Sequence, residues 1–72
     1  SDLAREHYER ALNLDGNNIG VIYEAANGLI LLDEIEDIKH AKKLLINALG
    51  IKPINHLDKM YLNKVKALID SL

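Results

Sequence analysis

Hydrophobic residues recur along the chain at intervals of three and four, and polar residues fill the positions between them. This period places apolar side chains on one face of an α-helix. It extends over residues 2–14, 18–32, 37–50 and 55–71, and in the first segment it comprises Leu3, Ala4, Tyr8, Ala11, Leu12 and Leu14. The pattern predicts an all-α fold of four amphipathic helices joined by short turns, with neighbouring helices antiparallel.

Polar residues at the segment ends support these limits. Residues 15–18 read Asp-Gly-Asn-Asn, and Gly50 and Pro53 follow the third segment, which are stop and turn signals. The candidate helix caps are Ser1 or Asp2, Asn17 or Asn18, and Asn55 with Asp58 three residues later. We expect residues 33–37 to form an acidic connector before the third helix.

Two local features of the first two helices give further expectations. Arg5 and Glu9 are four residues apart, which suits an ion pair on the helix surface. Gly28 lies inside the second predicted helix, where it costs about 1 kcal/mol relative to Ala. A glycine at such a position indicates that a neighbouring element approaches closely.

Length and composition limit the class of protein. The 72 residues suffice for one domain, and the chain has no Cys, so disulfides and thiolate metal sites are excluded. The net charge of −2 argues against generic nucleic-acid binding, and the longest apolar run, Leu29–Leu32, is far too short to span a membrane. We expect a cytoplasmic protein, with a periplasmic location left open. Because the chain starts at Ser1 without Met, a removed upstream segment and a longer parent chain also stay open.

Charge is unevenly distributed along the chain. Residues 1–37 carry nine acids and two Arg, whereas residues 38–72 carry seven Lys and two Asp. This asymmetry could steer a partner or drive head-to-tail association of copies. The simpler interpretation is that the two halves neutralise each other within one fold.

The first and third segments repeat each other at a distance of 37 residues. Ala4 corresponds to Ala41, Tyr8 to Leu45, Ala11-Leu12 to Ala48-Leu49, Leu14 to Ile51, and Gly16 to Pro53. A fixed period of this length is typical of repeated helical hairpins.

Both copies resemble the second helix and exit turn of a tetratricopeptide repeat. Together with the segment between them, the resemblance covers roughly 50 of the 72 residues. The resemblance implies a right-handed superhelix of helical hairpins, comprising about one full repeat and flanking helices. Residues 19–32 would be the first helix of the full repeat, with Ile22, Ala25, Ala26 and Leu29 at its packing positions. The repeat is three residues longer than the 34 of the family. Ile22, Ala26 and Leu29 replace the signature Trp, Gly and Tyr, and the last helix reads as a cap over an apolar face.

The resemblance also implies a binding surface. In this family the first helices line a groove that holds a peptide or a partner helix, and here Tyr23, Asn27, Ile30 and Leu31 would face it. Asn27 matches an Asn that, in one branch, helps clamp a C-terminal carboxylate. The Lys that accompanies it one turn earlier is Tyr23 in this chain. The competing interpretation is that Tyr23 packs against the fourth helix and Asn27 faces water.

No residue pattern indicates catalysis or a bound metal or cofactor. His7, His40 and His56 lack metal-ligand spacing, and Glu36 or Asp37 with His40 reads as a surface ion pair. Residues 16–20 lack the Lys and Ser or Thr of a phosphate loop. We therefore expect no enzyme activity.

Three functional hypotheses remain. The first is a non-catalytic scaffold that binds another protein or a peptide, without nucleic acid and without membrane insertion. The second is helical self-association, giving a homo-oligomer. The third follows from residues 4–12 and 44–51, which also resemble the periplasmic tetratricopeptide-like component of tripartite ATP-independent transporters. That resemblance implies a small-ligand cavity between helices.

Overall fold

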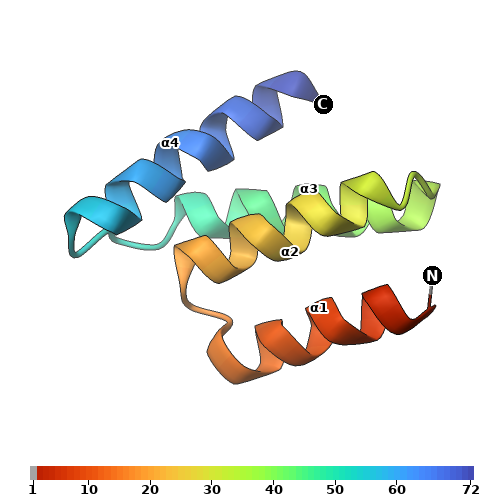
Figure 1. Cartoon of the computed structure of the whole chain (residues 1–72). Helices are drawn as coiled ribbons and strands as arrows, with labels where there is room; N and C mark the ends of the chain where they lie inside the picture. The colour runs from red at the N-terminus through yellow and green to blue at the C-terminus, as the bar shows by residue number, and fades with distance from the viewer. Residues whose placement is uncertain (1) are drawn as a thin grey trace.

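The computed structural model describes residues 2–72. These residues form four α-helices and no β-strand. They are α1 (Asp2–Asp15), α2 (Ile19–Leu31), α3 (Ile35–Leu49) and α4 (His56–Ser71). Figure 1 shows consecutive helices running in opposite directions, with α1 and α4 on either side of α2 and α3. The predicted all-α fold of four antiparallel helices is confirmed. The suggested cap at Ser1 lies outside the described residues.

The core forms where α2 packs against the other three helices. Ala26 of α2 and Ala41 of α3 are both fully buried, and their small side chains allow these two helices to lie close together. Larger side chains fill the space around this contact. The buried core cluster comprises Ile19, Ile22, Ala26, Leu29, Ala41, Leu45, Ala48 and Val65. The Cα atoms span 33 × 27 × 15 Å, so the domain is a slab with two broad faces.

Two asparagines begin α2 and α4 in the same way. The Asn18 side-chain oxygen accepts a hydrogen bond from the Val21 N–H at 3.2 Å, and that of Asn55 accepts one from the Asp58 N–H at 2.8 Å. Each satisfies a backbone donor that the helix itself leaves unpaired. The two caps are 37 residues apart, as are the first residues of α2 and α4. The sequence period therefore extends to the helix starts.

The connector between α2 and α3 is shorter than predicted. α3 begins at Ile35, so Glu36 and Asp37 belong to its first turn, and the expected connector at residues 33–37 is wrong in its second half. Carboxylates in a first turn interact favourably with the positive end of the helix dipole. Asp33 makes the turn possible with a φ of 58°, a left-handed conformation that Asp tolerates better than most residues.

Gly28 lets α1 approach α2. A methyl group added to Gly28 would overlap the ring of Tyr8, which lies over this position. The expectation of a close approach at Gly28 is confirmed, and the approaching group is a side chain of α1.

Candidate binding surface

The residues predicted to bind a partner lie along α2, in differing environments. Tyr23, Asn27 and Leu31 follow one another at four-residue intervals and so share one side of the helix. Tyr23 and Asn27 are half-buried, whereas Leu31 is 77% exposed. Ile30 is also half-buried and, like Tyr23, packs against the core. Leu31 is therefore the most accessible of the four predicted residues, and Tyr23, Asn27 and Leu31 are the three that share one side of α2.

Tyr61 and Lys64 of α4 lie next to Tyr23 and extend this surface. The rings of Tyr23 and Tyr61 lie 5.9 Å apart between centroids, and the Lys64 ammonium lies 5.7 Å from the first ring and 5.4 Å from the second. Aromatic faces attract a cation at such distances. We name Tyr23, Asn27, Leu31, Tyr61 and Lys64 the α2–α4 face. Tyr61 and Lys64 were missed by the sequence analysis, because α4 was interpreted only as a cap.

A hollow of about 380 Å³ adjoins the α2–α4 face. Tyr8 of α1 and Tyr61 of α4 stand on its two sides, and Ala25 and Gly20 of α2 form part of its floor. A methyl group on Gly20 would meet the Tyr61 ring at 3.0 Å, so glycine keeps this end of the hollow open. All three tyrosines of the chain thus line the hollow or the adjoining cluster, and the chain has no Trp.

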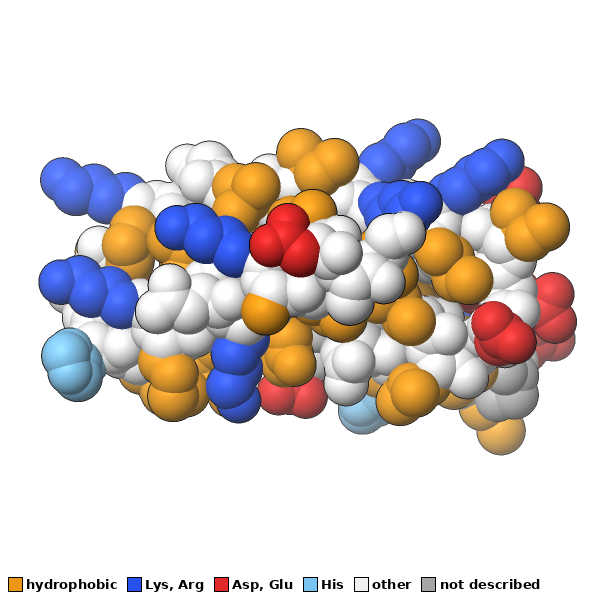
Figure 2. Space-filling view, turned by 90° about the horizontal axis from the view of Figure 1, so that it is seen from above, with side chains coloured by type: hydrophobic (Ala, Val, Ile, Leu, Met, Phe, Trp, Pro, Cys, Tyr) orange, Lys and Arg blue, Asp and Glu red, His pale blue; other side chains and the backbone are white. Residues whose placement is uncertain are grey.

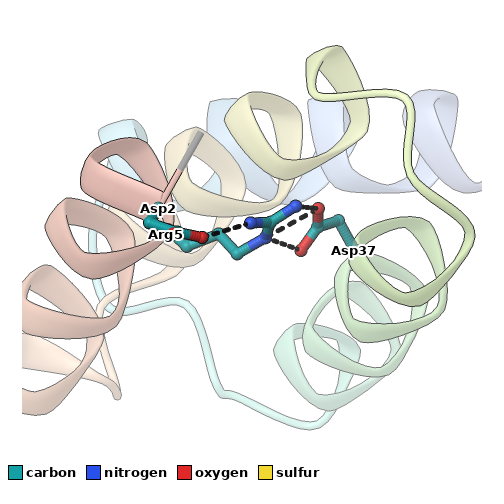
Figure 3. A network of polar contacts seen from close by, with 3 residues as sticks. All are labelled: Asp2, Arg5 and Asp37. Atoms are coloured by element: carbon teal, nitrogen blue, oxygen red, sulfur yellow. Dashed lines mark hydrogen bonds and ion pairs between the residues drawn. The ribbon is translucent and has the colours of Figure 1, made fainter.

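An ion pair joins α1 to α3 (Figure 3). The Arg5 guanidinium donates two hydrogen bonds to Asp37 from Nε, at 2.8 and 2.9 Å, and one from Nη2 at 2.8 Å, while Nη1 donates to Asp2. Asp37 is only 6% exposed. The expected Arg5–Glu9 pair is wrong, because Arg5 reaches across to α3 instead.

The same contact changes the acidity of both groups. Hydrogen bonding to Arg5, and then its positive charge, hold the pKa of Asp37 below its ordinary value against the opposing effect of burial. The pKa of Arg5 is raised for the same reasons. The Arg5–Asp37 pair is therefore charged at neutral pH and fixes α1 against the first turn of α3.

The remaining polar groups form no cluster with metal-ligand geometry. Among residues 2–72, no three His, Cys, Asp or Glu side chains converge on a point where an ion could be held. Glu36, expected beside His40, is instead 3.6 Å from Lys39. No helix in the described part of the chain has the length and apolar character needed to cross a bilayer.

Comparison of the chain with protein families, curated proteins and solved structures finds no match.

Proposed function

We propose that this chain is a non-catalytic interaction module whose α2–α4 face binds a peptide or a helix of another protein. The observation that carries the proposal is the cluster of Tyr23, Tyr61 and Lys64 on two different helices. Tyrosines bury a large apolar area while keeping a polar tip, which is why they are enriched in interfaces.

The polar groups of the face indicate the chemistry of the partner. Lys64 is held above the two rings and has no carboxylate within ion-pairing distance in the described residues. The Asn27 amide, one turn from Tyr23, offers further hydrogen-bond donors. A carboxylate on the partner would satisfy both, and an apolar side chain of the partner would enter the hollow beside Tyr61.

The tetratricopeptide resemblance supports the same face. We propose that α2 and α4 are the first helices of two successive repeats, because they begin 37 residues apart behind equivalent asparagine caps. In that family the first helices line the groove. In that family a Lys of the first helix accompanies the Asn, and Tyr23 stands at its position here. We propose that Lys64 of α4 supplies the missing positive charge.

Selection of peptides from a random display library against the immobilised chain tests the proposal. Selected peptides are expected to carry a carboxylate near an apolar residue and to change the tyrosine fluorescence on binding, since all three tyrosines border the proposed site. A Tyr23→Ala/Asn27→Ala variant should lose the selected peptides. Lys43→Ala, on the exposed side of α3, is the matched control and should retain them.

Two outcomes would contradict the proposal. One is that peptides bind the double variant as tightly as they bind the original chain. The other is that light scattering on a dilution series detects a stable oligomer whose formation hides the α2–α4 face, which would favour self-association.

A further inference from the structure

The side of α3 that faces away from α2 carries a second stripe of residues. Ile35, Lys39, Lys42, Ile46 and Leu49 follow at intervals of four and three, so they align along the helix for about 21 Å. The three apolar members are 71%, 60% and 44% exposed in chain order. The stripe is thus an uncovered amphipathic surface containing lysines and no acids.

A groove runs beside this stripe, between α3 and α4. Lys42 and Ile46 of α3 face Ile69 and Leu72 of α4 across a hollow of about 220 Å³, and we name these four residues the α3–α4 groove. Lys66 lies one turn before Ile69 on the same side of α4. Apolar side chains therefore form most of the groove lining, Lys42 stands at its edge on α3 and Lys66 lies nearby on α4, and Asp70 follows Ile69 in the sequence. Figure 2, viewed from the α4 side, shows hydrophobic side chains interspersed with lysines, while acids gather mainly at the end where α2 joins α3.

Lys42, Lys43 and Lys66 form no ion pair with any of the described residues 2–72. Among residues 2–72, the ion pairs are Asp2–Arg5, Arg5–Asp37, Glu6–Arg10 and Glu36–Lys39. Only the last joins the acidic half of the sequence to the basic half, and it lies within one helix. The acidic half of the chain therefore forms no ion pair with Lys42, Lys43 or Lys66 among the described residues, and these lysines are available to a partner.

The repeat period also indicates what would suit this groove. The face of α2 that packs against α3 is apolar, whereas the corresponding residues of α4, 37 positions later, are polar and exposed. Ile22 of α2 corresponds to Lys59 of α4, Ala26 to Asn63, and Leu29 to Lys66. A helix with the apolar face of α3 would bury these lysines without compensation. A helix with carboxylates beside its apolar residues would pair with them.

We propose that the α3–α4 groove binds an acidic amphipathic helix of a partner protein. Apolar side chains of that helix occupy the hollow between Ile46 and Ile69, and its flanking carboxylates pair with Lys42 and Lys66. A helix fits better than a lipid surface, because the groove is concave and parallel to α3, and helices dock in grooves through residues spaced three and four apart. This site is separate from the α2–α4 face and does not depend on the function proposed for it.

A designed peptide tests this proposal with the intact chain. The probe is a helical peptide with leucines on one face and glutamates on both flanks, and its control has glutamine in place of glutamate. Titration followed by backbone amide chemical shifts should perturb Lys42, Ile46 and Ile69 and leave the tyrosine fluorescence unchanged. A Lys42→Glu/Lys66→Glu variant should bind the probe at least about tenfold more weakly. Lys52→Glu, in the exposed turn before α4, is the control for a charge reversal outside the groove and should bind it normally.

A probe of opposite charge distinguishes a specific loss of binding from misfolding of the variant. A probe with lysines in place of its glutamates should bind the Lys42→Glu/Lys66→Glu variant better than it binds the original chain. The proposal is overturned if the glutamate probe binds both chains equally, if the glutamine control binds as well, or if the shifts fall on the α2–α4 face. It is also overturned if anionic phosphatidylserine vesicles bind the groove and the probe does not, which would identify a membrane surface instead.

Discussion

Replacing Gly28 with alanine tests how α1 is held against α2. In an open helix this change stabilises by about 1 kcal/mol, because alanine has the higher helix propensity. Here the added methyl would overlap Cζ and Oη of Tyr8 and lie 2.6 Å from its Cε1, well inside the normal contact distance of about 3.5 Å. Overpacking of this kind costs about 1–3 kcal/mol. We expect Gly28→Ala to lower the free energy of unfolding by about 1 kcal/mol.

The companion substitution is Tyr8→Leu, because Leu45 stands 37 residues later and packs without a tyrosine ring. With the ring removed, Gly28→Ala should become stabilising, so the sign of its effect reverses between the two backgrounds. Urea denaturation of the four chains in a double-mutant cycle measures this coupling. Gly50→Ala is the control, since a methyl there meets only one oxygen at 3.5 Å and should be neutral or slightly stabilising. A stabilising Gly28→Ala in the original chain would refute the docking of α1 through Tyr8.

Three further changes have expected outcomes. Asn18→Ala and Asn55→Ala should each cost about 1 kcal/mol in urea denaturation, whereas serine at either position should retain most of the cap. Leu45→Ala should cost about 3 kcal/mol because Leu45 is fully buried, and Leu14→Ala should be nearly neutral because Leu14 is exposed. Folding lowers the pKa of Asp37 from its ordinary value of 3.8, so its contribution is present above pH 3.8 and is lost as the pH falls through the lowered value. Asp37→Asn should therefore be less stable at neutral pH, and the difference should shrink in acid when both chains are followed by circular dichroism.

The helices could be predicted because their signals are local. Apolar periodicity located all four, and Asn18 and Asn55 each cap a helix as polar residues before an apolar stripe should. The start of α3 was placed two residues too late, at Asp37, because Ile35 and Glu36 were assigned to the acidic connector.

The tertiary contacts could not be predicted because no local pattern encodes them. Arg5 and Asp37 are 32 residues apart, and Glu9 was the more obvious partner for Arg5 by sequence. Tyr61 and Lys64 join Tyr23 only because α4 packs along α2. The competing expectation, that Tyr23 packs against the fourth helix, describes the same contact. Its packing and the proposed binding role are compatible, since the residue is half-buried.

The central claim is that the α2–α4 face is a binding surface, and amide chemical-shift mapping with a display-selected peptide tests it most directly. If this face binds the peptide, the largest shifts fall on Tyr23, Asn27, Tyr61 and Lys64, and Lys64→Ala weakens peptide binding without unfolding the chain. Shifts confined to the other side of α3, or a library that yields no peptide sensitive to Lys64→Ala, would contradict it.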